Sequence, residues 1–200
     1  MHYGATALGL VSEMPSGPGI IPMDRIKELA EYIPESTLSV LLTSSQDSQT
    51  ITEQVQFSNV NAVQIVDRLE IGSYADIRKN CPGITIIQVI HIVNDSSIIE
   101  ANKISDNVDA ILLDSGNQAF TTKELGGTGR IHDWSISKQI CKTGNIPVIL
   151  AGGLNSDNVT IALKTVHPTG VDICSGVRTD GSMDEWKLTK YIQNVQAYFI

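Results

Sequence analysis

The feature that most constrains the fold is a repeated alternation of short apolar, β-branched runs with longer amphipathic segments. A strand followed by a helix, seven times over, predicts a parallel sheet whose connections are crossover helices. We expect strands at Thr6–Ser12, Leu38–Thr43, Ala62–Val66, Ile84–Ile92, Asp109–Asp114, Pro147–Ala151 and Val171–Cys174. We expect helices at Asp24–Ile33, Asp47–Ser58, Tyr74–Asn80, Ser96–Ser105, Trp134–Thr143, Asp157–Val166 and Asp184–Tyr198.

The domain organisation follows from the absence of any linker, charge block or low-complexity tract in the sequence. Residues 1–200 are therefore predicted to form a single domain, a size for which one core suffices. Ser156-Asp157 and Ser182 carry side-chain oxygens just before the last two expected helices. We expect them to act as N-caps there.

Composition excludes several classes of protein. The 22 acidic and 14 basic residues give a net charge of −8 without a Lys/Arg cluster, so nucleic acid is not an expected partner.

No apolar run approaches the ~20 residues of a membrane span, and no signal peptide is visible, so we expect a cytoplasmic protein. Cys81, Cys141 and Cys174 are far apart and are expected to be free thiols. Metal-ligand spacing is lacking, and neither a metal nor a cofactor is expected.

Glycines follow two consecutive late strands, as Gly152-Gly153 and as Ser175-Gly176. Parallel barrels place their active sites at these strand ends, and a residue without a Cβ lets backbone amides approach a phosphate. The two loops together therefore predict a binding site for a phosphorylated small molecule. The alternative is that both are simply tight strand-to-helix turns.

Carboxylates lie at the ends of two of these strands. Asp114 closes a nearly pure aliphatic run, where partial desolvation would suit a general acid; an N-cap or a loop ion pair is the alternative. Asp172 lies within the last expected strand, two residues before Cys174. Period-two alternation would place both side chains on one face. Asp172 is equally well interpreted as a buried structural carboxylate.

Other polar groups are weaker candidates. Gly127 lies in a glycine-rich run that lacks the GxxxxGK[ST] pattern of a nucleotide loop, so we interpret it as a lid over the mouth or a flexible loop without ligand contact. Gln64 and Asp67 flank the end of the third expected strand and His91 ends the fourth. A lone strand-end histidine is more often structural than catalytic.

Three groups of residues, taken together, resemble one family. They are Val108–Ser115, then Gly126–Arg130 closing on Asp133-Trp134, and finally Ala151–Leu154 with Asp172–Val177. In order and spacing they resemble phosphoribosylanthranilate isomerase, the aldose–ketose isomerase of tryptophan synthesis. The resemblance implies that Asp114 protonates the furanose ring oxygen, that Asp172 contacts the substrate's amine side, and that the two glycine loops hold the ribose phosphate.

The resemblance also predicts how much of a barrel is present. The segment His2–Val11 resembles the family's passage from its first helix into its second strand. We therefore expect an α/β fold of the TIM (β/α)8-barrel type that lacks the first βα unit and keeps seven parallel strands; a complete barrel has eight units in about 250 residues. Such a sheet would have an open edge, for which three arrangements are expected. The two outer strands could meet in a smaller barrel, a loop or a second copy in a homodimer could cover the gap, or residues preceding this sequence could fill it.

Two functional positions of the family have no counterpart here. The family's base is a cysteine in a Lys-Ile-Cys-Gly-type first strand, and an arginine in the next loop holds the substrate, where this sequence has the uncharged run Pro15–Pro22. Cys174, beside the vacant strand position, is a speculative replacement base, and Glu13 is another. Three functions stay open: an isomerase of this kind, a divergent homologue that only binds a phosphorylated metabolite, or a barrel that needs a further segment or partner.

Overall fold

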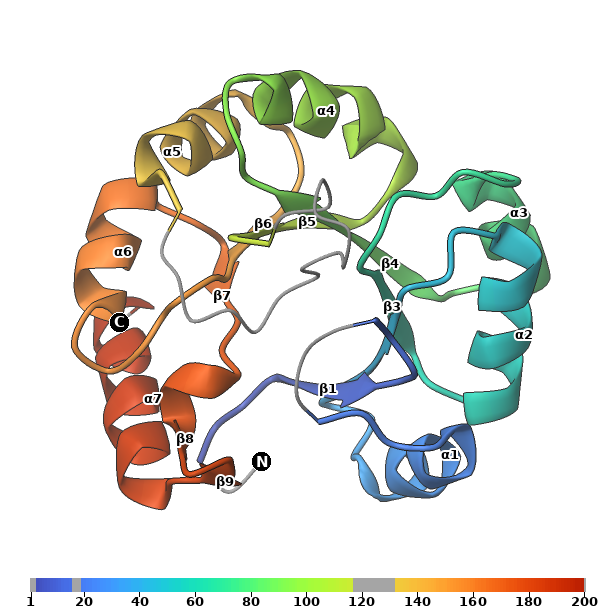
Figure 1. Cartoon of the computed structure of the whole chain (residues 1–200), viewed down its shortest axis with the longest axis horizontal. Helices are drawn as coiled ribbons and strands as arrows, with labels where there is room; N and C mark the ends of the chain where they lie inside the picture. The colour runs from blue at the N-terminus through green and yellow to red at the C-terminus, as the bar shows by residue number, and fades with distance from the viewer. Residues whose placement is uncertain (1–2, 16–18, 117–131, 200) are drawn as a thin grey trace.

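A computed structural model describes residues 3–15, 19–116 and 132–199. Seven parallel strands form one curled sheet whose spatial order follows the chain (Figure 1). Within the described ranges, β1 and β7 are the two edges and do not pair with each other. The expected seven-stranded partial barrel is therefore confirmed. The strands are β1 Ala7–Val11, β2 Leu38–Thr43, β3 Ala62–Ile65, β4 Thr85–His91, β5 Ala110–Asp114, β6 Val148–Leu150 and β7 Gly170–Val171.

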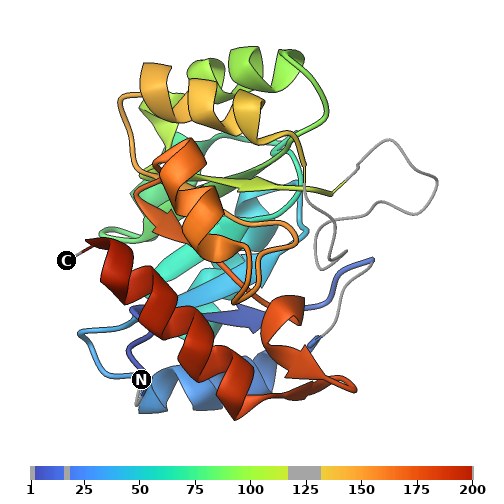
Figure 2. The same ribbon diagram turned by 90° about the vertical axis from the view of Figure 1, so that its left-hand side faces the viewer.

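In the described ranges, seven helices cover the outside of the sheet. Figures 1 and 2 show them around the strands, which run toward the same end of the molecule. The helices are α1 Met23–Tyr32, α2 Ser48–Ser58, α3 Tyr74–Asn80, α4 Ser96–Ile104, α5 Trp134–Thr143, α6 Val159–Val166 and α7 Glu185–Phe199. Side-chain caps begin several of them: Asp47 accepts hydrogen bonds from the amides of Gln49 and Thr50 at the start of α2. Within the described residues, none of these helices is long and apolar enough to cross a bilayer.

The strands have two apolar faces because their side chains alternate with period two. The face toward the helices carries the larger cluster, which includes Leu41, Ile65 and Ile111. The inner face carries a smaller cluster with Val89 and Leu112, so side chains and not solvent occupy the lower part of the curled sheet. Only the residues at the carboxyl ends of the strands remain to form an open mouth.

The end of the sheet differs from expectation in two ways. Strand β7 covers only Gly170–Val171, although the Asp172 amide still donates to the Leu150 carbonyl at 2.9 Å. The chain then turns into a 3₁₀ turn, η2 (Ser175–Val177), with Cys174 at φ −128° and ψ −74°. The strand-face argument that grouped Cys174 with Asp172 is therefore wrong. A short antiparallel hairpin that was not predicted follows, formed by β8 (Arg178–Thr179) and β9 (Ser182–Met183).

The expected caps of the last two helices are wrong as well. Ser182 lies in β9, and Asp184 caps α7 by accepting a hydrogen bond from the Lys187 amide at 3.0 Å. Before α6, Asn155 accepts hydrogen bonds from the amides of Asp157 and Asn158. Asp184 therefore reaches a free amide of the first turn of α7, whereas Asn155 orders the turn that precedes α6.

The two ends of the chain meet on the outside of the sheet. The Tyr3 hydroxyl is hydrogen-bonded to the Glu185 side chain at the start of α7. A Cβ added at Gly4 would lie 2.7 Å from Nε2 of Gln196 on the same helix. The segment leading into β1 therefore packs on α7, the helix that follows the last strands.

Candidate active site

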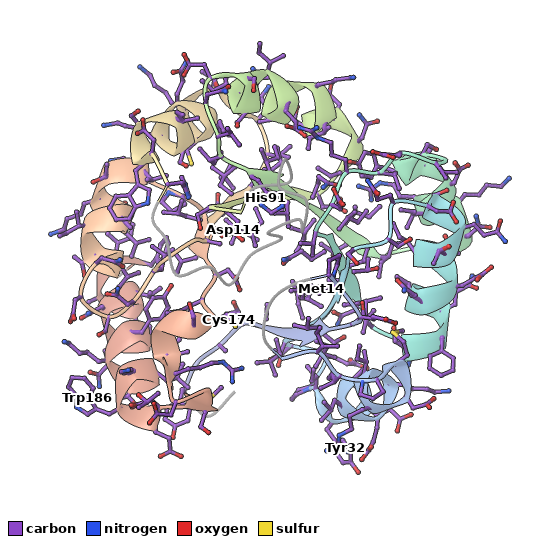
Figure 3. The ribbon with its side chains drawn as sticks, in the orientation of Figure 1. Met14, Tyr32, His91, Asp114, Cys174 and Trp186 are labelled. Atoms are coloured by element: carbon purple, nitrogen blue, oxygen red, sulfur yellow. The ribbon has the colours of Figure 1, made fainter. Side chains whose placement is uncertain are left out.

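The mouth of the curled sheet is formed by residues that end strands or directly follow them. His91 and Asp114 are register partners at the ends of β4 and β5. Asp172 follows β7, and Cys174 lies two residues further along the chain. Figure 3 shows His91, Asp114 and Cys174 around the open centre, with Met14 from the loop after β1 across from them. These strands therefore bring an imidazole, two carboxyl groups and a thiol to one end of the sheet.

Asp114 is held in place by the loop that it begins. Its side chain is only 8% exposed, and Oδ1 accepts a hydrogen bond from the Ser115 amide at 2.7 Å. The loop after β6 closes over this carboxyl group: a Cβ at Gly152 would lie 3.0 Å from Asp114 Oδ1 and 2.9 Å from the Ser115 nitrogen. Gly152 also has φ +81°, which favours glycine. The structure thus brings Asp114 and Gly152 together.

Asp172 has a perturbed ionisation. Its side chain is exposed, just after the end of β7. Burial among the surrounding protein and the nearby carboxylate of Asp114 raise the pKa of Asp172 from 3.8 to about 6, against a smaller lowering effect of the Ile173 amide. A carboxyl group that titrates near neutrality is suited to proton transfer.

The two late glycine loops touch each other. A Cβ at Gly176 would lie 2.0 Å from the Leu154 carbonyl oxygen, so only glycine allows the turn after β7 to pack under the turn after β6. Ser175 and Gly176 open η2, and the first amides of a helical turn have no partner within it. Among the described residues, these amides and that of Gly153 (φ +64°) donate no hydrogen bond to another element. These two turns together therefore offer the backbone N–H donors that a bound anion requires.

His132 joins this set, and the sequence analysis did not single it out. Its Nε2 lies 2.7 Å from Oγ of the fully buried Ser137 on α5. Its Nδ1 is sealed from solvent without a partner in the described part of the chain. Burial lowers the pKa of His132, against the opposing charges of Asp114 and Asp133. The only signal in the sequence is its place beside Asp133, which caps α5 through the Ser135 amide.

His91 has mainly a structural role. Its Nε2 lies 3.0 Å from the Val66 carbonyl oxygen, and because a carbonyl only accepts, Nε2 carries the proton. The ring therefore ties β4 to the end of β3, which agrees with the structural interpretation of a strand-end histidine. Gln64 and Asp67 are also buried near the end of β3.

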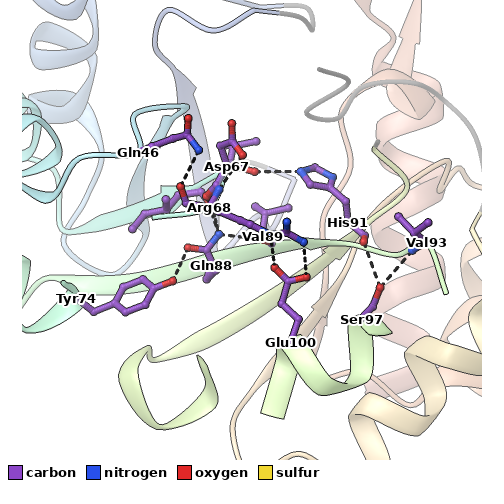
Figure 4. A network of polar contacts seen from close by, with 12 residues as sticks. Gln46, Asp67, Arg68, Tyr74, Gln88, Val89, His91, Val93, Ser97 and Glu100 are labelled. Carbon is purple, nitrogen blue, oxygen red and sulfur yellow. Dashed lines mark hydrogen bonds and ion pairs between the residues drawn. The ribbon is translucent and has the colours of Figure 1, made fainter. Parts of the chain in front are cut away.

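A buried glutamine supports the same corner from the helix-facing side of the sheet (Figure 4). Nε2 of Gln88 donates to the carbonyl oxygens of Ile65, Asp67 and Val89 at 2.9–3.0 Å, and its Oε1 accepts from the Tyr74 hydroxyl at 2.9 Å. Burial and then the charge of Glu100 raise the pKa of Tyr74 to about 12, so the phenol remains a donor. The network holds the chain as it leaves β3.

Several other predictions stay untested. Gly127 lies outside the described residues. Cys174 is half-buried beside η2, and Glu13 is exposed after β1. In the described part of the chain, no group of three or more His, Cys, Asp or Glu side chains is placed to hold a metal ion. That the protein needs no metal or cofactor remains a prediction.

Comparison with known proteins gives one consistent result. A family model described as N-(5'-phosphoribosyl)anthranilate (PRA) isomerase matches residues 12–194. The N-(5'-phosphoribosyl)anthranilate isomerase 2 of Methanosarcina mazei is 33% identical over 99% of this chain and 88% of its own. The crystal structure of phosphoribosyl anthranilate isomerase from Thermotoga maritima superposes with a TM-score of 0.80, at 25% identity over 98% of this chain and 90% of its own. Monomers generated from that dimeric enzyme give a TM-score of 0.76 at 23% identity, over the same shares of the two chains.

Fold and site define a protein of the parallel (β/α)-barrel class, with a carboxylate-bearing mouth at the carboxyl ends of its strands. The chain belongs to the N-(5'-phosphoribosyl)anthranilate isomerase family.

Proposed function

We propose that this protein is an isomerase that converts N-(5'-phosphoribosyl)anthranilate into its ketose isomer in tryptophan biosynthesis. The observation that carries the proposal is the pair Asp114 and Asp172, which the ends of β5 and β7 bring within electrostatic reach of each other. Family membership supplies the substrate, since the relatives take their name from it. General acid–base catalysis on a sugar requires side chains that donate and accept protons close to the reacting atoms, and these two carboxyl groups lie at the same end of the sheet.

Asp114 is the proposed acid. It donates a proton to the furanose ring oxygen, the C1–O bond breaks, and the lone pair of the anilino nitrogen forms a Schiff base. A base then removes the C2 proton, and the electron pair of that C–H bond forms the enolamine, which becomes the ketone when C1 is protonated. Asp172, with its pKa of about 6, lies at the proposed amine side of the substrate, where it can share a proton with the nitrogen.

The phosphate has a proposed place at the two touching glycine turns. The amides of Gly153, Ser175 and Gly176 have no acceptor in another described element, and Gly152 brings its turn against Asp114. The same turns would therefore hold the phosphate and fix the distance from it to the acid. Gly127 is proposed to belong to a loop that covers the mouth.

The base is the open part of the mechanism, and we propose Cys174 for it. Its half-buried thiol lies at the start of η2, beside the amides proposed to bind phosphate. A homodimer in the cytoplasm, with the second copy over the open edge between β1 and β7, completes the proposal; the solved Thermotoga maritima relative comes from a dimeric enzyme.

Turnover of phosphoribosylanthranilate, followed by the loss of its fluorescence, tests the proposal. We expect the wild-type chain to consume the substrate and Asp114→Asn to lose at least about a hundredfold in kcat, because a general acid contributes that much or more. An inactive wild-type chain that still binds phosphate would support the divergent binding protein instead. Cys174→Ser tests the base separately: unchanged turnover would exclude Cys174 and leave the acid assignment intact.

A further inference from the structure

Arg178 carries a positive charge that no described carboxylate neutralises. It lies on β8, directly after η2, and its amide donates a hydrogen bond to the Ser175 carbonyl oxygen. Among the described residues, the loops that follow the seven strands contain two arginines and no lysine, namely Arg68 after β3 and Arg178 after β7. Arg68 is occupied, because its guanidinium donates to both oxygens of Glu100, at 2.8 and 3.0 Å. Arg178 forms no ion pair with another described residue.

The hairpin that carries Arg178 is tied to α7 through one of its two faces. Thr179 Oγ1 donates to Asp184 Oδ2 at 2.7 Å and accepts from Lys187 Nζ at 2.8 Å. Because adjacent side chains of a strand point to opposite faces, Thr179 faces α7 and Arg178 faces away from it. Figure 1 shows β8 and β9 between α7 and the open edge of the sheet, and Figure 2 shows them at the end toward which the strands run. The face with Arg178 is therefore turned toward the open side of the mouth.

The guanidinium of Arg178 is held in place, but most of its donors are unused. Its Nη1 donates to the Gly181 carbonyl oxygen at 2.8 Å, across the turn of the same hairpin. An arginine presents a planar fork of N–H donors, and the remaining ones have no acceptor among the described residues. The cross-strand partner on the same face is Met183, which is 58% exposed. A half-buried guanidinium beside an exposed apolar side chain suits a carboxylate that is attached to an apolar ring.

The proposed substrate has an anion at each end, a phosphate on its ribose and a carboxylate on its anthranilate ring. The two glycine turns are proposed to hold the phosphate, which leaves the carboxylate without a partner. The carboxyl groups of Asp114 and Asp172 lie at the same end of the sheet, in a chain of net charge −8. Like charges at close range repel, so a carboxylate bound beside these groups requires a positive partner.

We propose that Arg178 binds the carboxylate of an aromatic acid, with the side chain of Met183 against the ring. That this acid is the anthranilate end of the substrate rests on the proposed function. The turn η2 then holds both ends of one molecule: the amides of Ser175 and Gly176 at its start bind the phosphate, and Arg178 at its end binds the carboxylate. Arg178 is in this way a specificity-determining residue, which favours the carboxylated ring over an unsubstituted one.

Two ligands that differ by one group test the proposal, in calorimetric titrations of the full chain. The first is the ketose product with its carbonyl reduced to an alcohol, and the second has phenyl in place of the carboxyphenyl ring. We expect the wild-type chain to bind the first about tenfold to a hundredfold more tightly, as a hydrogen-bonded charge pair does. In Arg178→Met the two affinities should agree within about twofold. Arg68→Met, at the other arginine of these loops, is the matched control and should keep the wild-type difference.

Further measurements separate the two anions and the two proposals. Arg178→Lys keeps the charge without the fork and should retain part of the difference. Inorganic phosphate should bind the wild-type chain and Arg178→Met with the same affinity. An undiminished preference for the carboxylated ligand in Arg178→Met, or a loss of phosphate binding in its place, overturns the proposal. A wild-type chain that shows the preference but does not turn over phosphoribosylanthranilate overturns the proposed function alone, and one that binds neither ligand overturns both.

Discussion

The carboxyl groups of Asp114 and Asp172 stand at the same end of the sheet, and desolvation by the surrounding protein and, after it, the charge of Asp114 disfavour the ionisation of Asp172. The folded chain therefore binds a proton at Asp172 up to about pH 6, whereas the unfolded chain releases it near pH 3.8. The contribution of this group to stability is fully present below pH 3.8 and is lost as the pH rises through 6. A group that we propose takes part in turnover therefore works against the stability of the fold near neutral pH.

Replacing Asp172 by Asn should therefore make the protein more stable above pH 7, relative to the wild-type chain, while abolishing its role in turnover. The variant should also lose the part of the pH dependence that falls between pH 4 and 6. Thermal unfolding at a series of pH values measures both. Asp184→Asn is the control of opposite sign, because hydrogen bonds from Thr179 and from the Lys187 amide lower the pKa of Asp184. An Asp172→Asn variant less stable than the wild-type chain at pH 8 would contradict the expectation.

Gly176 tests whether the two glycine turns need each other. The Cβ of Gly176→Ala would overlap the Leu154 backbone oxygen at 2.0 Å, and neither backbone has room to move cheaply. We expect a loss of about 3 kcal/mol, or about 5–10 °C in melting temperature, and weaker binding of inorganic phosphate. Gly170→Ala is the matched control, since a Cβ there meets nothing within 4 Å. Equal melting temperatures for the two variants would show that the turns are not packed as described.

At the scale of the elements, most bounds were predictable within two residues. Strand β2 and helices α3 and α5 coincide with the expected ranges. Apolar periodicity and caps act locally, so a sequence reveals them. The predicted end of strand β7 was wrong because the chain leaves the sheet where Gly176 contacts Leu154 of another loop. No local sequence pattern records that contact. His132 was missed because its place near Asp114 depends on the fold, which no local pattern records.

The corner after β3 depends on Gln88, which serves three backbone carbonyls at once. Gln88→Met keeps the side-chain volume but leaves those carbonyls, and the Tyr74 hydroxyl, without this partner. We expect a loss of about 2–4 kcal/mol in the free energy of unfolding, measured by urea denaturation. Gln56→Met removes a single exposed hydrogen bond to the Asn80 carbonyl and should cost less than about 1 kcal/mol. Similar losses in both variants would remove the special role of Gln88.

At the scale of the whole molecule, the curled sheet has a buried interior and two edges that are more exposed. Every residue of β3 and β5 is buried, whereas β1 and β7 are partly exposed and each lacks a strand on its outer side among the described residues. Unpaired edges are sites where a further strand or chain can add. The family resemblance predicted the open sheet, but it did not indicate that the segment before β1, with Tyr3 and Gly4, would pack on α7.

Hydrogen exchange of the backbone amides tests this gradient and the proposed homodimer together. We expect the amides of β3, β4 and β5 to exchange only through global unfolding, as one cooperative unit consistent with a single domain, and those of β1 and β7 to exchange through smaller openings. If a second copy covers the open edge, protection of β1 and β7 should increase with protein concentration while that of β4 stays constant, because only the edges gain partners on association. Equal protection of all seven strands, independent of concentration, would instead mean that the edges are closed within one chain.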